Sequence, residues 1–394
     1  RSVRVASPCV GVARPASAAQ ALQYPWESIL ICDIEAELTP ALERLHRPAR
    51  AGLIRTGPRK GDVTRLTQET LQRHLAEHGY KVCDGLVSGF PCPPYSSIGA
   101  RLLGDDPRAQ VCTAVIMMIV WMAKENHLVW FVLENVPGIM KRKRGEPESF
   151  ADKLMKYIVE KLELHGCMGW NVVLRPHTSA NCALCQHRDR VFFVGTAPCL
   201  RASHVQRAMQ AAPLPVRAAA GLMSVLERRS SPGDFAGLTP NQQLNVMAQV
   251  KKFDEIEAST PGFDCAMAAI DAGRNPDLDS VDDNLKFDRV STFRTNNKFI
   301  WLVPQKALRD IFGPYGRLMT REEKCRASGI EPRSLVDLST HRVEVALGNT
   351  IPPPLVGDVL APVLASWTLY MRDLQVDDRC MFSVCASCVL RCVI

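Results

Sequence analysis

The sequence predicts a doubly wound α/β fold, and two observations support this prediction. Short apolar segments rich in β-branched or aromatic residues alternate with segments of helical periodicity through the first half of the chain. There is also enough apolar material for a sizeable core, since 46% of the 394 residues are hydrophobic and 23% are charged. This composition excludes an intrinsically disordered chain, a collagen-like chain and a small disulfide scaffold. An alternating strand–helix order is typical of a mostly parallel sheet, which binds ligands at the carboxyl ends of its strands.

Each expected strand is short and is bounded by polar residues, Gly or Pro. The strands are Ser2–Ala6, Ser28–Cys32, Gly85–Ser88, Leu128–Leu133 and Val191–Gly195. The expected helices between them are Glu35–His46, Gln68–His78, Ala109–Lys124 and Phe150–His165. The longest apolar run, Val111–Ala123, is shorter than the roughly 20 residues that cross a bilayer, so it predicts a buried helix and no membrane contact.

The pattern changes in the second half of the chain. From about Pro198 to Gly316 no strand–helix unit repeats, which indicates a second and less regular module. Helical character returns at Thr320–Ala327, which Thr320 can cap, and at Val356–Arg372 after three prolines.

Cysteine usage and charge bear on the compartment and on the partners. The 15 cysteines are an odd number, and Cys32, Cys83 and Cys112 lie singly in apolar segments, as buried reduced thiols do. We therefore expect an intracellular protein, and the N-terminal residues lack a signal-peptide pattern. A net charge of +7 permits a polyanionic partner without proving one.

The segment Gly85–Gly99 holds the most informative cysteine. An apolar strand runs into a loop in which Cys92 lies between Pro91 and Pro93, so its backbone is stiff at the ligand-binding edge of the sheet. A nucleophilic thiolate at such an edge can form a covalent intermediate. An inert loop cysteine is the alternative.

A carboxylate follows the next apolar strand. Leu128–Leu133 ends in Glu134 and Asn135, at the same edge as Cys92. A carboxyl group buried there favours its protonated form and can act as a proton donor. The alternative is a surface glutamate that closes the strand.

Two arginines lead into a third strand. Arg188 and Arg190 are two residues apart in Gln186–Gly195, so in extended chain they project to one face while Asp189 points away. Paired arginines can hold a carbonyl oxygen, a phosphate or a carboxylate. A surface strand of alternating charge is the alternative.

These residues resemble the C5-cytosine methyltransferase family. The Gly-Phe-Pro-Cys loop, the Glu-Asn-Val strand end and the Gln-x-Arg-x-Arg segment occur in that family's order and at its approximate spacing. Four further segments match: Cys32–Glu35 its ribose-binding strand end, Gly61–Thr64 its adenine turn, Leu318–Gly329 its bracing helix, and Gly348–Pro352 its closing motif. The resemblance covers residues 3 to about 370 and implies a Rossmann-like methyltransferase sheet with helices on both faces.

The resemblance implies a chemistry for the cytosine ring. The thiolate of Cys92 would add to C6, which activates C5 toward the methyl group of S-adenosylmethionine. Glu134 would hydrogen-bond or protonate N3, and Arg190, supported by Arg188, would bind O2. The target base must leave the stack to reach the sheet edge.

The resemblance also implies a cofactor site. Asp33 would bind the ribose hydroxyls, as an acidic residue after the second strand does in doubly wound folds, although it could instead cap a helix. Ile34 would lie against the adenine, and Asp62, with Val63 beside it, would reach the adenine amino group. The remaining expected cofactor contacts are Cys9, Gly11, Pro91, Asn349 and Thr350.

The first loop differs from the family's glycine-rich turn. Only Gly11 remains, Cys9 stands where an aromatic ring would stack on adenine, and Ala13 and Arg14 stand where the family has backbone-only positions. A nucleic-acid-binding module that lost its cofactor is therefore an alternative to an enzyme.

Three further features have weaker interpretations. The basic run Lys141–Arg144 could track phosphates, serve as a nuclear address or be a solvated loop. Packing explains Cys182 and Cys185 better than metal does, because no second pair lies at finger spacing, and we expect no metal site. The cysteines of the tail, Cys380, Cys385, Cys388 and Cys392, have apolar neighbours that favour a hydrophobic tail over zinc.

We thus predict a methyltransferase catalytic domain over 1–197, a small irregular target-recognition insert over 198–317, a returning segment over 318–372 and a tail over 373–394. The predicted function is S-adenosylmethionine-dependent methylation of cytosine C5 in DNA, with RNA as the second substrate class. Cationic candidates in the insert are Arg228, Arg229, Arg289, Arg294 and Lys298.

Overall fold

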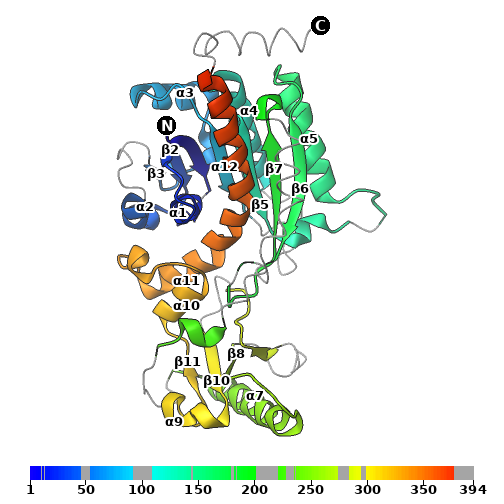
Figure 1. The fold of residues 1–394 in the computed structure, drawn as a ribbon. Coiled ribbons are helices and arrows are strands. Elements are labelled where there is room, and N and C mark those ends of the chain that lie inside the picture. Colours follow the sequence, from blue (N-terminus) through cyan, green and yellow to red (C-terminus); the bar gives the residue numbers. More distant parts are fainter. Residues whose placement is uncertain are drawn as a thin grey trace. The chain divides into compact units, whose positions relative to one another are not determined.

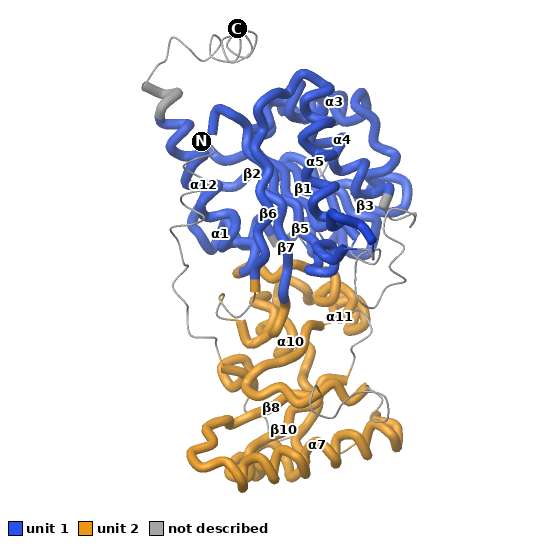
Figure 2. The backbone as a smooth tube through the Cα atoms, turned by 90° about the vertical axis from the view of Figure 1, so that its right-hand side faces the viewer, with its two compact units in different colours: residues 1–177, 189–215, 355–394 blue, residues 178–188, 216–354 orange. Residues whose placement is uncertain are grey.

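The computed structural model describes residues 1–9, 11–12, 14–45, 54–91, 109–142, 145–178, 182, 184–200, 221–227, 235, 237–273, 284–293 and 299–376. The chain divides into two compact units (Figure 2). The first comprises residues 1–177, 189–215 and 355–394, and the second comprises residues 178–188 and 216–354.

A seven-stranded sheet in the order β3-β2-β1-β4-β5-β7-β6 forms the centre of the first unit (Figure 1). Its strands are β1 (Val3–Pro8), β2 (Trp26–Asp33), β3 (Ile54–Thr56), β4 (Gly85–Gly89), β5 (Trp130–Asn135), β6 (Asn171–His177) and β7 (Arg190–Thr196). Neighbouring strands are parallel except that β7 runs antiparallel to both β5 and β6. The carboxyl ends of β1, β2, β4 and β5 and the amino end of β7 therefore share one edge.

Helices cover both faces of this sheet, with α1 and α12 on one side and α3, α4 and α5 on the other (Figure 2). The helices of the unit are α1 (Arg14–Ala21), α2 (Thr39–Leu45), α3 (Gln68–Glu77), α4 (Ala109–Glu125), α5 (Phe150–Leu164) and α12 (Pro353–Val376). The predicted α/β class is confirmed. The helix expected over Glu35–His46 is divided into a 3-10 turn at Ala36–Leu38 and α2.

One helical stretch among the described residues, Thr340–Arg372, is long and apolar enough to cross a membrane by length and composition. Half of its most apolar window is buried in the protein. Leu355, Val359 and Val363 of α12 are completely buried. The apolar character of α12 is thus explained by core packing.

The second unit is more regular than the sequence predicts. Its four-stranded antiparallel sheet has the order β11-β10-β8-β9, with β8 (Met267–Asp271), β9 (Lys286–Phe287), β10 (Ile300–Pro304) and β11 (Arg317–Leu318). The 20-residue helix α7 (Pro240–Ser259) begins at a capping box of Thr239 and Gln242 and packs Val246 and Phe253 against Trp301 of β10. Short helices α9 (Arg309–Phe312), α10 (Arg321–Ala327) and α11 (Thr340–Asn349) follow.

Helix α10 begins at Thr320, as predicted, and carries a buried ion pair. The carboxylate of Glu323 accepts hydrogen bonds from both terminal nitrogens of Arg317 at 2.8 and 2.6 Å, and from the amides of Thr320 and Glu227. These contacts join α10 to the second unit. The predicted returning segment, 318–372, is divided between the two units: residues 318–354 cluster with the second and residues from 355 onward with the first.

Removal of the Glu323 carboxylate is expected to destabilise the second unit. Glu323→Ala would leave the Arg317 guanidinium, with a side chain 7% exposed, without its counter-charge, and breaking such a buried pair costs about 3–5 kcal/mol. Glu322→Ala, at an exposed position of the same helix, is the matched control. Urea unfolding followed by tryptophan fluorescence measures both, and equal midpoints would contradict the assignment.

The same pair predicts acid sensitivity. Burial alone would raise the pKa of Glu323, but the hydrogen bonds from Arg317, Glu227 and Thr320 hold that pKa below its usual range. A lowered native pKa contributes stability above the unfolded value of about 4.3, and this stability is lost as pH falls through the native value. The stability difference between the parent chain and Glu323→Ala should therefore shrink below about pH 4.

Candidate active site

Two of the predicted residues form an ion pair at the shared edge of the first sheet. Glu134 lies near the end of β5 and Arg190 is the first residue of β7, and Nε of Arg190 is 2.6 Å from Oε1 of Glu134. Each side chain is about nine-tenths buried. The antiparallel direction of β7 explains the meeting, because it brings the start of that strand to the end of β5.

The ion pair changes the expectation for Glu134. The sequence argument treats a lone buried carboxyl group, which favours the protonated form. In the structure this carboxyl group has a counter-charge, since Nε of Arg190 lies 2.6 Å from it. Arg190 also donates from Nη1 to its neighbour's carbonyl, Asp189 O, at 2.6 Å, which orients the guanidinium.

Asn135 connects the Glu134 strand to the Cys92 loop. Its buried side-chain amide donates to the carbonyl oxygen of Phe90 at 3.2 Å, and its oxygen accepts from the amide of Val136 at 2.9 Å. Strands β4 and β5 are in parallel register, with Gly89 opposite Glu134. The chain is thus held beside the ion pair as far as Phe90 and the half-buried Pro91. Cys92 itself lies outside the described residues.

Three cysteines of the first unit, Cys9, Cys32 and Cys112, are poor nucleophiles. Burial raises the pKa of Cys32 and of Cys112 to about 12. Burial, followed by the nearby Asp33 carboxylate, raises the pKa of the Cys9 thiol still further. These thiols remain protonated at neutral pH, and only a thiolate attacks.

The carboxylate of Asp33 organises the edge where the sequence predicts the cofactor. Oδ2 accepts from the amide of Gly11 at 2.9 Å and Oδ1 from the amide of Glu35 at 3.0 Å. Burial raises the pKa of Asp33 to about 6, against the effect of these two hydrogen bonds. Each carboxylate oxygen keeps a further lone pair that can accept from a ribose hydroxyl.

The turn that carries Asp62 packs directly on Asp33. A Cβ atom on Gly61 would lie 1.7 Å from the carbonyl oxygen of Asp33, so only glycine fits there. That carbonyl also accepts from the amide of Gly57 at 3.2 Å. The close approach brings Asp62 beside the end of β2, which the sequence motif alone did not explain.

Ile34 is exposed enough to contact an adenine, whereas the side chains of Asp62 and Val63 have contacts within the protein. Ile34 is an apolar side chain that is 55% exposed directly after Asp33, as a residue that stacks on adenine requires. Asp62 accepts from the amide and hydroxyl of Thr64 at 3.0 and 2.6 Å and so also caps a 3-10 turn. Val63 is buried, which leaves its main chain as the part that could meet a ligand.

Gly61→Ala is expected to weaken S-adenosylmethionine binding by at least ~10-fold, or about 1.4 kcal/mol, because the added Cβ must push Asp62 away from Asp33. Calorimetric titration measures the affinity. Gly357→Ala is the control, since a Cβ there meets Ala18 at an ordinary 3.7 Å. Equal affinity in the parent chain and Gly61→Ala would show that this turn does not form the cofactor site.

Cys9 adopts a backbone conformation that favours glycine. Its φ is +53°, and Gly11 has φ +57°. A side chain in this region costs roughly 1–2 kcal/mol. Cys9 therefore occupies a strained turn position, and it also lacks the aromatic ring that the family has there. Its amide still donates to Cys32 O at 2.8 Å, which keeps the loop against β2.

Arg188 and Arg190 fall in different compact units. Strand β7 begins only at Arg190, so the rule that alternate residues share a face does not extend to Arg188. Arg188 belongs to the second unit, where its guanidinium binds main-chain carbonyls. Asn349 and Thr350 also belong to the second unit.

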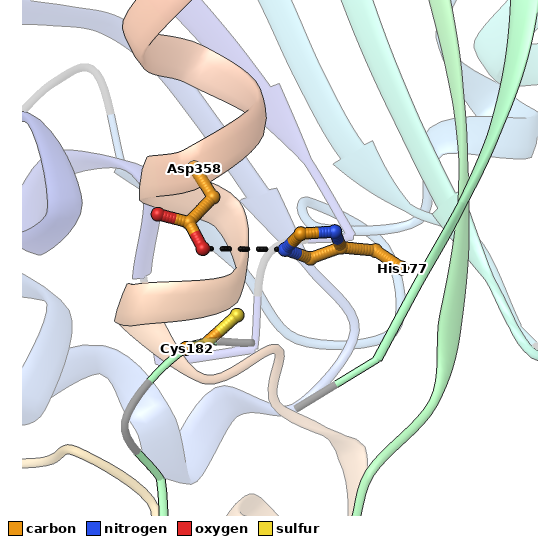
Figure 3. Close-up of side chains that lie close together, drawn as sticks. All are labelled: His177, Cys182 and Asp358. Carbon is orange, nitrogen blue, oxygen red and sulfur yellow. Dashed lines mark hydrogen bonds and ion pairs between the residues drawn. The ribbon is translucent and has the colours of Figure 1, made fainter. Parts of the chain in front are cut away.

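The end of β6 is joined to α12 by a pair that the sequence analysis missed. Nε2 of His177 lies 3.3 Å from Oδ2 of Asp358, and Figure 3 shows the imidazole facing the carboxylate. Cys182, also drawn there, belongs to the second unit. His177 is opposite Arg190 in the β6–β7 register, so the pair anchors the outer edge next to the active-site strand.

The other predicted features are the cysteine pair, the basic run, the tail and the cationic residues of the insert. Cys182 and Cys185 are buried thiols, and Sγ of Cys182 donates to the carbonyl oxygen of Thr178 at 3.6 Å. Lys141 and Arg142 are exposed, whereas Lys143 and Arg144 are outside the described residues, as is the tail beyond Val376. Of the five cationic candidates in the insert, only Arg289 is described.

Comparison with known proteins shows which family the chain belongs to. A family model for C-5 cytosine-specific DNA methylases matches residues 57–363. The type II methyltransferase M.HgiCII of Herpetosiphon aurantiacus is 34% identical over 136 residues, which are 34% of this chain and 25% of that protein. M.DsaV of Dactylococcopsis salina is 27% identical over 135 residues, or 32% of its length. The matched region is thus about a quarter to a third of these relatives.

Solved structures match over nearly the whole chain. The Dnmt2 methyltransferase of S. pombe has a TM-score of 0.55 at 15% identity, covering 92% of this chain and 98% of that one. The methyltransferase EhMeth of Entamoeba histolytica has a TM-score of 0.58 at 13% identity, covering 93% and 99%. The fold is therefore that of a Rossmann-like methyltransferase. Because the family model matches well over half of the sequence, the chain belongs to the C-5 cytosine-specific DNA methylase family.

Proposed function

We propose that this chain is an S-adenosylmethionine-dependent enzyme that methylates cytosine C5 in DNA. Family membership supports the reaction class. The observation that carries the proposal is the buried ion pair of Glu134 and Arg190, held by Asn135 beside the chain that leads to Cys92. The pair lies at the edge of the sheet where doubly wound folds bind their ligands, so its two charges are placed to meet a substrate.

The ring chemistry divides between three side chains. The thiolate of Cys92 forms a bond to C6, and the ring electrons move toward N3 and O2. Glu134 takes up a proton as the ring enters and donates it to N3, and the proton returns to Glu134 when the thiolate leaves; Arg190 donates to O2, where negative charge grows. Since Glu134 and Arg190 already bind each other, the ring enters a preorganised charge pair and little reorganisation is needed.

The remaining steps restore the enzyme. S-adenosylmethionine, when bound, supplies an electrophilic methyl group to C5. The C5 proton then leaves to water, the bond between the Cys92 sulfur and C6 breaks, and the thiolate is regenerated. The base must be flipped out of the duplex, since C6 is not reachable inside the stack.

The residues at the end of β2 fit the adenosine part of this cofactor. Asp33 would accept from the ribose, Ile34 would cover the adenine, and Asp62 would bind its amino group. Gly11 and Pro91 would complete the pocket from the first unit, with Cys9 in the strained turn. The family resemblance adds Asn349 and Thr350, and the hydroxyl of Thr350 is buried without a hydrogen-bond partner among the described residues.

The second unit would recognise the target sequence, and its base preference is a separate question from the chemistry. The same ring reaction applies to cytosine in RNA, so an RNA substrate is one outcome of the test. The departures of the first loop from the family's pattern, Cys9 and Arg14 among them, leave a second candidate, a nucleic-acid-binding module without methyl transfer. The type II methyltransferases named above also support an intracellular protein.

Transfer of tritiated methyl groups from S-adenosylmethionine decides between these outcomes. The parent chain is incubated separately with duplex DNA and with RNA. Each nucleic acid is then digested to nucleosides, and the label in the cytosine fraction is counted. Label in DNA supports the proposal, and label in RNA alone replaces the substrate. No label in either, with nucleic-acid binding retained, would establish the binding module.

A further inference from the structure

The guanidinium of Arg188 is bound to main-chain oxygens. Nη1 donates to the carbonyls of Phe293 and Leu347 at 3.3 and 3.4 Å, and Nη2 donates to that of Gly348 at 2.9 Å. The residue is 1% exposed. A guanidinium that is buried and already binds three carbonyls offers no surface to a cytosine ring.

Two of these carbonyls belong to the last turn of α11, which has no C-terminal cap of its own. The last four carbonyls of a helix lack intrahelical partners. The last turn of α11 has no basic residue, and Thr350, which follows the helix, has an extended φ of −90° rather than the left-handed value of a capping glycine. Arg188 supplies both the missing donors and a positive charge at the negative end of the helix dipole.

The segment that carries Arg188 is itself fixed. The amide of His187 donates to Val290 O and the amide of Val290 donates to Cys185 O, each at 2.8 Å. The hydroxyl of Thr292 also donates to His187 O. The guanidinium therefore holds the end of α11 from a backbone whose preceding residues are bound to Val290 and Thr292.

The turn that Arg188 holds leads directly to Asn349 and Thr350. Thr350 is 2% exposed, and its hydroxyl has no hydrogen-bond partner among the described residues. A buried hydroxyl without a partner is destabilising, and a ligand group could restore its hydrogen bond. The position of this hydroxyl depends on the turn that precedes it.

We infer that Arg188 is a positioning residue for the Gly348–Thr350 turn, and that it acts on cofactor binding rather than on the cytosine ring. The inference rests on the proposed function, because it takes S-adenosylmethionine as the ligand of the turn. It separates the two arginines of the Gln-x-Arg-x-Arg segment, since Arg190 pairs with Glu134 and Arg188 caps α11.

Arg188→Lys tests the inference while keeping the charge. A single ammonium cannot reach three carbonyls, so we expect the calorimetric Kd for S-adenosylmethionine to rise ~10-fold, with kcat at saturating cofactor changed less than ~3-fold. Hydrogen exchange of the amides at Leu347–Thr350 should also become faster. Arg333→Lys, an exposed position in the same unit, is the matched control.

Thr350→Val provides a second route, because it keeps the side-chain shape and removes only the hydroxyl. If Arg188 acts through the turn, the losses of affinity in the two variants are less than additive in the double variant. Additive losses, or an unchanged Kd in Arg188→Lys, would overturn the inference. A fall in kcat of Arg188→Lys at saturating cofactor, with unchanged Kd, would return Arg188 to the ring chemistry. The calorimetry distinguishes this inference from the proposed function, since a parent chain that binds the cofactor without methyl transfer would contradict only the latter.

Discussion

Cys92→Ser is expected to reduce methyl transfer by ~10³-fold or more, because a serine hydroxyl is far less ionised than a thiol and is a weaker nucleophile toward C6. Nucleic-acid affinity should change little, since the substitution replaces one atom. Single-turnover methyl transfer at saturating cofactor and DNA measures the chemical step. Cys167→Ser, a half-buried position at the turn between α5 and β6, is the matched control.

A covalent adduct gives an independent measurement of the same step. Fluorine at C5 cannot leave as a proton, so DNA with 5-fluorocytosine in the target should remain bound to the parent chain through denaturation. Cys92→Ser should abolish this adduct. An adduct that persists in Cys92→Ser would show that another residue is the nucleophile. Cys9, Cys32 and Cys112 are poor candidates for that role, because burial raises the pKa of each thiol.

The sequence predicts the edge of the first sheet well because strand order and residue type act locally there. A polar residue after an apolar strand marks a carboxyl end, and parallel strands bring such ends together. Glu134 and the Phe90–Pro91 segment meet for this reason. Arg190 reaches the same edge from β7, which is antiparallel to β5. The sequence motif includes Arg190, but it does not reveal the direction of this strand.

Contacts between segments far apart in the sequence could not be predicted. Arg188 binds carbonyls about 160 residues away, and no local pattern distinguishes a capping arginine from a catalytic one. Gly61 is essential only because Asp33 O approaches it, which requires the fold. In the second unit, α7 carries a capping box that the sequence does show, at Thr239 and Gln242, and this signal was available but not used.

The turn at Cys9 has a backbone conformation that the sequence comparison could not show. A one-dimensional comparison assigns Cys9 to an aromatic ring, and the φ of +53° shows that glycine suits the backbone there. The cost to the enzyme is then partly conformational. It does not require that the adenine lose its only apolar contact, because Ile34 remains exposed beside Asp33.

Glu134→Gln is expected to reduce the single-turnover rate by ~10² or more while nucleic-acid affinity changes little. Glutamine keeps the shape and one acceptor, but it removes the charge that pairs with Arg190 at 2.6 Å. Arg190→Ala should have an effect of similar size, because it removes the donor to O2 and leaves a buried carboxylate without its counter-charge. Arg190→Lys keeps the charge and loses the planar fork, so its rate should lie between those of the parent chain and Arg190→Ala.

The double variant separates a cooperating pair from two independent contacts. If Glu134 and Arg190 act as one preorganised unit, the rate of Glu134→Gln with Arg190→Ala should be close to that of the slower single variant, because either change already dismantles the unit. Unchanged turnover in Glu134→Gln would remove Glu134 from the mechanism. Fully additive losses would mean that each residue meets the ring separately, and that their contact in the protein without substrate serves only to neutralise two buried charges.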